Sequence, residues 1–264
     1  MKINHQYMRL FTVLLLALIS FACQTNLSEE AKAIDYDRYP EAFQKVLEQH
    51  GGLEQWNQMS SLEFERINSA GNEKHRIDLV NRTDRIDGPD FKMGFDGEQY
   101  WVDADTSFQR DPVFYHNLMF YFYAMPFVLA DEGVNYSEAD PLQVDSTTTL
   151  PGVKMTFNEE VGSSPEDNYI VYYNPETYQM EWLAYTATYF SQEASDEFSY
   201  IRYDNWAEFN GLQLPQSMTW YRSAEGLPTE PRNTIHFTAT KISETVLEPD
   251  YFAPPAGSSI LNQF

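Results

Sequence analysis

The side chains that could carry chemistry are few and lie far apart along the chain. Four of the five histidines follow the first segment, and none has the HxxH or HExxH spacing of a zinc site. These four are His50, His75, His116 and His236. The chain has one cysteine, which excludes a disulfide within it, and it has neither a G-x-S-x-G nucleophile motif nor a phosphate-binding glycine loop. The sequence therefore predicts no catalytic residues, no metal and no cofactor, and we do not expect an enzyme.

Two acidic clusters could bind calcium but do not match a calcium loop. Asp103 and Asp105 have the spacing of the opening of such a loop, but the sixth position is not glycine. Glu159-Glu160 and Glu166-Asp167 flank a turn and form a weaker candidate. We expect solvated turns at both places.

Residues 1–22 have the order of an export signal. Lys2 and Arg9 come first, an apolar stretch over residues 10–19 follows, and small residues end the segment. The apolar stretch is about half the roughly 20 residues that a helix needs to cross a bilayer. We expect this segment to be removed by cleavage and not to span the membrane.

The only cysteine, Cys23, is predicted to carry lipid. Residues 19–23, Ile-Ser-Phe-Ala-Cys, resemble a bacterial lipobox, in which the signal is cut before a cysteine that is then acylated. The resemblance implies a lipid anchor at Cys23. The polar residues that follow predict a tether over 23–38, and without a repeat or a proline-rich linker we expect a single β-rich domain over 39–264. Several acyl chains together anchor a protein stably, whereas one holds only marginally. We expect an outer-membrane lipoprotein of the bacterial envelope, facing the periplasm or exposed at the surface. The alternative is that Cys23 is an incidental thiol at the end of a signal anchor or of an ordinary cleavable signal.

The composition excludes nucleic-acid binding and disorder. The 264 residues include 40 Asp and Glu against 17 Lys and Arg, a formal net charge of -23, and such a surface repels phosphate backbones. Hydrophobic residues make up 42% of the chain and aromatic residues 16%, which is enough to build a buried core. The length suits one large β-rich domain.

The periodicity predicts a helical start followed by a long series of strands. Pro40 opens a helix with one apolar face, Gly51-Gly52 ends it, and a short second helical turn follows. From Leu62 onward the period becomes two, and about ten strands follow without alternating helices. Asp96-Gly97 and Asn210-Gly211 are dipeptides that type I′ hairpin turns favour. The predicted strands cover residues 62–64, 77–79, 91–95, 100–102, 153–157, 169–173, 178–190, 198–209, 212–222 and 234–242.

One aromatic block interrupts the strands. Asp111-Pro112 forms a helix cap and first turn, and residues 113–130 continue as an apolar helix that Pro126 should bend or end. Three interpretations are open: a core helix on the concave face of the sheet, a movable lid over a cavity, or a helix lying on the membrane. A cavity under this block would be lined by aromatic side chains from the block and from the strands. The alternative is that these side chains pack a solid core without a cavity. The candidates are Trp101, Phe114, Phe120, Phe122, Phe127, Trp182 and Trp220.

Five longer motifs lie at residues 40–62, 115–118, 164–167, 172–180 and 209–215. Together they resemble a family of Bacteroidota lipoproteins of unknown function, the DUF6503 type. The likeness covers nearly the whole mature chain but implies no chemistry. Asp145-Ser146-Thr147 also fits the short O-glycosylation pattern of that group of bacteria.

The layout is similar, more distantly, to the LolA/LolB-like lipoprotein-sorting superfamily. That similarity implies a mainly β fold, with an antiparallel curved sheet in an incomplete barrel and helices covering its concave face. It also implies a lipid or acylated protein as ligand. We therefore expect a non-catalytic envelope lipoprotein that binds a hydrophobic ligand. The alternatives are a scaffold or interaction lipoprotein with a filled core and, third, a hydrolase-type enzyme.

Overall fold

The described residues form one large antiparallel sheet of 13 strands. The computed structural model describes residues 34–105, 108–158, 164–191 and 193–261. Residues Asp35–Phe264 form one compact unit. The described helices are α2 (Glu41–Gln49), α3 (Leu53–Gln58), α4 (Pro112–Tyr123) and three short 3-10 turns at Tyr36–Arg38, Phe127–Ala130 and Pro249–Tyr251. The strands are β1 (Ser61–Arg66), β2 (Glu73–Asp78), β3 (Asp84–Asp87), β4 (Phe91–Phe95), β5 (Tyr100–Ala104), β6 (Val134–Gln143), β7 (Thr149–Phe157), β8 (Tyr169–Tyr173), β9 (Met180–Tyr185), β10 (Ser199–Phe209), β11 (Leu212–Ala224), β12 (Leu227–Ser243) and β13 (Ser259–Leu261).

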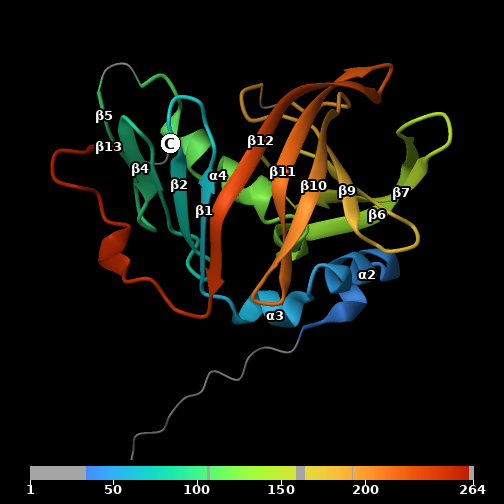
Figure 1. Ribbon diagram of the computed structural model, residues 1–264, viewed down its shortest axis with the longest axis horizontal. Coiled ribbons are helices and arrows are strands. Elements are labelled where there is room, and N and C mark those ends of the chain that lie inside the picture. The colour runs from blue at the N-terminus through green and yellow to red at the C-terminus, as the bar shows by residue number, and fades with distance from the viewer. Residues whose placement is uncertain (1–33, 106–107, 159–163, 192, 262–264) are drawn as a thin grey trace, which may run out of the picture. The chain divides into compact units, whose positions relative to one another are not determined.

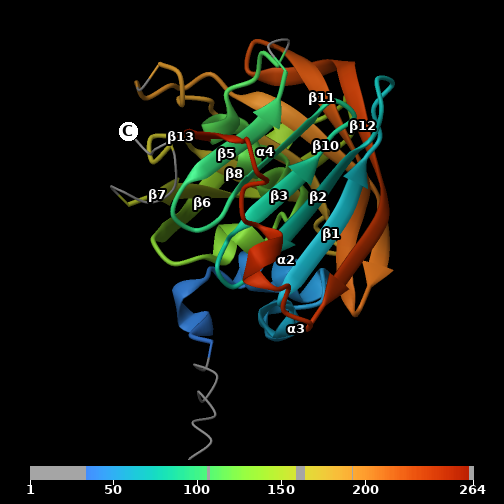
Figure 2. The same ribbon diagram turned by 90° about the vertical axis from the view of Figure 1, so that its left-hand side faces the viewer.

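The strand order joins two meanders at a central pair. It runs β13-β5-β4-β3-β2-β1-β12-β11-β10-β9-β8-β7-β6, so β1 pairs with β12 and the two outer strands do not meet. Figure 2 shows β1 beside β12 at this junction. The predicted antiparallel meander is confirmed, and the sheet is not closed into a barrel.

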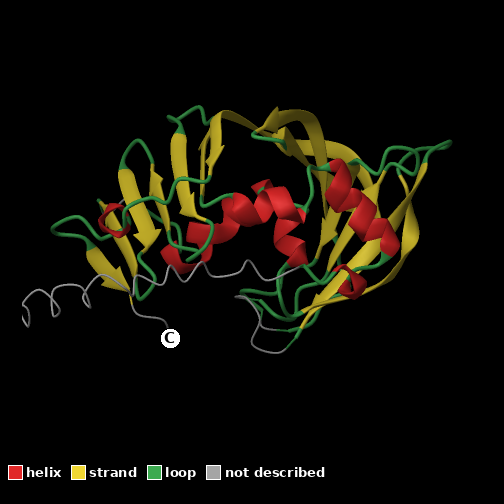
Figure 3. Cartoon of the chain, turned by 90° about the horizontal axis from the view of Figure 1, so that it is seen from below, coloured by secondary structure: helices red, strands yellow, loops and turns green. Residues whose placement is uncertain are grey.

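The topology requires the segment between β5 and β6 to cross the whole sheet. β5 lies next to one edge strand, while β6 is the other edge. Helix α4 and the 3-10 turn at Phe127–Ala130 make this crossing, and Figure 3 shows them between the two halves of the bent sheet. The predicted helix is thus confirmed, and it ends at Tyr123, three residues before the proline that was expected to bend or end it.

Helices α2 and α3, which precede the sheet in the chain, pack against the hairpin between β10 and β11. Figure 1 shows α2 and α3 at one end of the strands. Gly51 has φ +111, and a Cβ there would meet the Gly211 carbonyl oxygen at 2.3 Å, so the helix can approach the hairpin only with glycine at this position. Asn210 and Gly211 themselves have φ 49 and 81 in a two-residue turn, as the sequence predicted.

The Asp96-Gly97 turn differs from the expected two-residue form. Phe95 pairs with Tyr100, so the loop has four residues. The Asp96 carboxylate accepts backbone N–H bonds from Glu98 and Gln99, both at 2.9 Å, which favours this wider loop.

Candidate functional site

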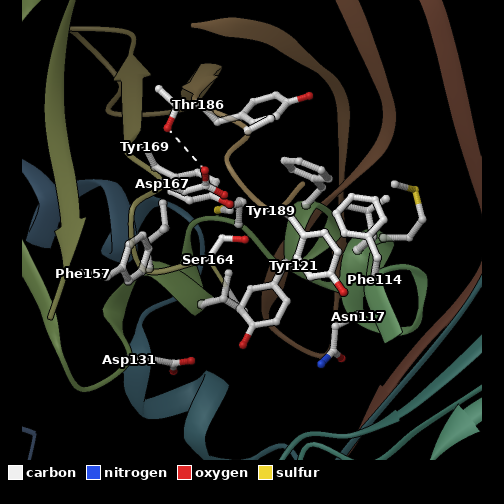
Figure 4. Close-up of a pocket in the computed structure, with 18 of the residues that line it drawn as sticks. Phe114, Asn117, Tyr121, Asp131, Phe157, Ser164, Asp167, Tyr169, Thr186 and Tyr189 are labelled. Carbon is white, nitrogen blue, oxygen red and sulfur yellow. Dashed lines mark hydrogen bonds between the residues drawn. The ribbon is translucent and has the colours of Figure 1, made fainter. Parts of the chain in front are cut away.

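An apolar pocket of about 440 Å³ lies beside α4. Its walls come from α4, the segment that follows it, and the strands β7, β8, β9 and β11 with the loop after β9. Most of its lining side chains are aromatic or aliphatic, and Figure 4 shows them around the space. The volume falls within the range of about 300–1,000 Å³ that is usual for ligand pockets.

Helix α4 can serve both the core and the pocket because it is apolar on every side. Asp111 caps it by accepting N–H bonds from Val113 and Phe114. The helix contacts β3, β4 and β5, while the Tyr203 hydroxyl on β10 donates to the Phe122 carbonyl oxygen at 2.8 Å. A helix that is hydrophobic all round is buried from several sides. This explains how one element can pack on the sheet and still present side chains to the pocket.

Three aromatic side chains form a fixed wall of the pocket. The Phe122 ring lies 5.0 Å from Tyr185 and 5.8 Å, edge to face, from Trp220. The Trp220 Nε1–H donates to the Tyr185 hydroxyl at 3.0 Å. The polar atom of the indole is therefore satisfied, and the wall presents mainly carbon to the pocket.

A second aromatic group lies where α4 begins. The Phe114 ring is 4.7 Å from Tyr189 and 5.0 Å from Phe190. Phe190 is 75% exposed, which is unusual for so large an apolar side chain. This group joins the helix to the loop after β9 and borders the pocket.

The carboxyl groups that line the described pocket belong to Asp131, Glu132 and Asp167, and none of its lining residues is Lys, Arg or His. Asp131 pairs with the Arg82 guanidinium at 2.9 Å and its side chain is 42% exposed. Asp167 is only 8% exposed and has no cationic partner among the described residues. Burial raises the pKa of its carboxyl group, although hydrogen bonds from Thr188 and Thr186 oppose the shift.

Three of the seven predicted lining residues lie at this pocket: Phe114, Phe122 and Trp220. The other four are buried elsewhere. Trp101 donates to the Phe252 carbonyl oxygen, and Phe120 lies under the Arg82 guanidinium. Phe127 stacks on Trp56 at 4.7 Å, and Trp182 contacts Tyr221 edge to face. Cys23 lies outside the described residues, as do Glu159 and Glu160.

The sequence analysis missed a buried polar cluster between α4 and the sheet. His116 donates from Nδ1 to Asp84 on β3 at 2.8 Å, and its Nε2 faces the Asn117 side-chain amide at 3.3 Å. Both ring nitrogens of His116 therefore lie within hydrogen-bonding distance of a polar side chain. Asn117 in turn lines the pocket. Burial raises the pKa of Asp84, and the neighbouring His116 opposes that shift.

A second part of this cluster holds a carboxylate between two arginines. Glu73, 1% exposed, lies 3.1 Å from Arg66 and 2.9 Å from Arg110 and accepts a hydrogen bond from the Tyr115 hydroxyl. These partners lower the pKa of Glu73 despite its burial. Glu73 and Asp84 both lie on strands where alternation alone gives no sign of a buried charge. The tyrosine-histidine pair at 115–116, on a helix otherwise apolar, was the available signal.

No group of three or more His, Cys, Asp or Glu side chains in the described ranges could hold a metal ion. Within the same ranges, no helix is long and apolar enough to cross a membrane.

Comparisons with known proteins agree with the resemblance inferred from the motifs. Residues 104–226 match the model of DUF6503, a family of unknown function, and this range contains every quoted motif except residues 40–62. No curated protein matches the chain.

Two solved structures are similar to this chain over 80% of its length, at low sequence identity. A LolA superfamily protein from Nitrosomonas europaea has a TM-score of 0.46 and 9% identity, covering 80% of this chain and 96% of that one. A domain described as an outer membrane lipoprotein-sorting protein, from Vibrio parahaemolyticus, has a TM-score of 0.38 and 8% identity, covering 80% and 94%. The predicted resemblance to DUF6503 is confirmed over residues 104–226.

Proposed function

We propose that this protein is an anchored envelope lipoprotein that binds a lipid, an acylated protein or another hydrophobic molecule without catalysing a reaction. The observation that carries the proposal is the apolar pocket of about 440 Å³ beside α4. Apolar surface removed from water contributes about 25 cal/mol for each Å². An enclosed aromatic surface is therefore sufficient to hold an apolar chain.

The anchor in this proposal is Cys23. Residues 1–22 are the cleaved signal, 23–38 the tether, and 39–264 the binding domain. The protein belongs to the bacterial envelope, at the outer membrane, on its periplasmic face or exposed. Helix α4 covers the concave face of the sheet and forms one side of the binding pocket.

The pocket volume favours binding over a filled scaffold. A core packed solid by the aromatic block would leave only spaces of a few water molecules. Here Phe122 and Trp220 instead border a space large enough for a ligand. The exposed Phe190 at its edge also favours a site where apolar molecules enter.

A hydrolase lacks support from the polar groups near the pocket. The Nε2 atom of His116 faces the Asn117 amide, and no described hydroxyl bonds to the His116 ring. Asp167 accepts from Thr186 and Thr188, but no described histidine, lysine or second carboxylate bonds to this group. A nucleophile needs an adjacent base with its own orienting partner, and neither group provides that arrangement.

Native mass spectrometry of the protein purified from envelopes tests the proposal. Ala187 is exposed and lines the pocket, so Ala187→Trp should fill the space without disturbing the core. Ala70→Trp, at an exposed position in a loop away from the pocket, is the matched control. We expect a bound hydrophobic molecule on the wild type and on Ala70→Trp, and much less on Ala187→Trp. Bare wild-type protein, or equal occupancy in all three, contradicts the proposal.

A further inference from the structure

The polar group that matters most for ligand choice is a single buried carboxylate in the pocket wall. Asp167 is 8% exposed, lines the pocket and is drawn there in Figure 4 with its hydrogen bond to Thr186. The other acidic lining residues, Asp131 and Glu132, are more exposed. Among the described lining residues there is no Lys, Arg or His to neutralise Asp167.

The hydrogen bonds of Asp167 all go to one of its two oxygens. Its Oδ1 accepts from the Thr188 N–H at 2.7 Å, the Thr188 hydroxyl at 2.8 Å and the Thr186 hydroxyl at 3.5 Å. The Thr186 hydroxyl also accepts from the Asn168 N–H at 2.8 Å, which orients it. Asp167 Oδ2 has no hydrogen-bond partner within the described part of the chain. The carboxylate is thus held in place by one oxygen while the other is available.

A buried carboxylate with an available oxygen favours one sign of ligand. A cation or hydrogen-bond donor at Oδ2 would form a charge-assisted hydrogen bond there, which is stronger than a bond between neutral groups. A carboxylate or phosphate would instead meet like charge in a weakly screened space.

The aromatic rings of the same wall strengthen this preference. Tyr169 and Tyr185 stack at 6.3 Å, and Phe157 meets Tyr169 edge to face at 5.6 Å. Burial raises the pKa of the Tyr169 phenol, and the neighbouring Asp167 carboxylate raises it further. Aromatic faces beside a carboxylate are a suitable environment for an organic cation.

We propose that the pocket selects an amphiphile whose apolar chain ends in a protonated amine, with the amine at Asp167 and the chain against Phe122 and Trp220. This rests on the proposed function, because it names the class of ligand for the same pocket. Fatty acids and phosphate-terminated lipids are disfavoured ligands at this site.

Three probes with the same chain separate the two proposals: octylamine, octanol and octanoate. Binding to the full-length lipoprotein in nanodiscs is followed by tryptophan fluorescence, with empty nanodiscs subtracted. We expect octylamine to bind at least roughly tenfold more tightly than octanoate, since a charged hydrogen bond contributes that much or more. Asp167→Asn keeps Oδ1 for Thr188 and removes the charge, so it should abolish the amine preference and leave octanol binding unchanged. Asp90→Asn, the control at an exposed acid that does not line the pocket, should keep the preference.

The outcomes distinguish the two failures. Equal binding of all three probes, or an amine preference that survives in Asp167→Asn, overturns the selection by Asp167 while the hydrophobic pocket stands. If no probe binds the wild type, both proposals fail. Melting curves of the Asp167 variant show that it is folded before any loss of preference is interpreted.

Discussion

His50 should make the protein less stable in acid by a calculable amount. The ring is fully buried at the end of α2, where Nδ1 donates to the Val46 carbonyl oxygen at 2.7 Å and Nε2 accepts from the Gln179 amide at 2.6 Å. A protonated ring would turn a second N–H toward that amide. Burial lowers the pKa of His50 from 6.5 to about 4, with the bond to Val46 opposing the shift.

The lowered pKa fixes both the sign and the size of the effect. Between pH 6.5 and pH 4 the unfolded chain binds a proton at this ring and the folded chain does not, so the free energy of unfolding falls as the pH falls. Above pH 6.5 the contribution is constant. From pH 7.5 to pH 5 the loss amounts to about 2 kcal/mol. This range also stays above the isoelectric point of about 4.4.

Urea unfolding of the wild type and His50→Gln at several pH values measures the effect. Glutamine does not titrate, and the other acidic and basic groups are common to both proteins. The difference between their unfolding free energies should therefore shrink by about 2 kcal/mol from pH 7.5 to pH 5. Asn233→Gln, at an exposed strand position without a titratable group, should leave the pH profile unchanged. If the profiles of wild type and His50→Gln are parallel, the buried neutral ring is refuted.

Three further predictions concern the buried charge, the helix cap and the anchor. Glu73→Gln leaves Arg66 and Arg110 without their buried carboxylate and should lower the free energy of unfolding by about 3 kcal/mol. Glu41→Gln, which removes the charge of an exposed ion pair, is the control and should change it little. Similar urea midpoints for the Glu73 variant and the wild type would contradict this prediction. Asp111→Ala removes the N-terminal cap of α4 and should lower the free energy of unfolding by about 1 kcal/mol in the same urea assay. Asp90→Ala, at an exposed position, is the control, and an unchanged free energy in the Asp111 variant would count against the cap. Cys23→Ser should move the protein from membrane to soluble fractions, and continued tight membrane association would argue against acylation.

The sheet was largely predictable because its strands alternate strongly. Phe91, Met93 and Phe95 lie on β4, and the Asn210-Gly211 turn requires the positive φ values that it has. The strands that were missed carry weak or polar patterns. β3 reads Asp-Arg-Ile-Asp, and exposed residues dominate β6. The Glu225-Gly226 turn was missed although both residues have positive φ, because glutamate is not a usual residue for that position.

The site was less predictable because it depends on which strands become neighbours. Phe114 and Phe122 follow from the helix that carries them, whereas Trp220 reaches the pocket only through the position of β11 in the sheet. Periodicity cannot distinguish Trp220 from Trp182, because both are tryptophans on predicted strands. Trp182 packs against Tyr221 instead of lining the pocket. Asp167 is distinguished only by its burial, which sequence patterns do not report.

Photolabelling with an alkyl diazirine probe tests the central claim most directly, because it locates the bound chain. The account predicts that labels on the full-length lipoprotein concentrate in peptides containing Phe122 and Tyr185, and that Ala187→Trp suppresses them while Ala70→Trp does not. Labels spread evenly over the exposed surface, or unchanged in Ala187→Trp, would contradict a hydrophobic binding pocket beside α4.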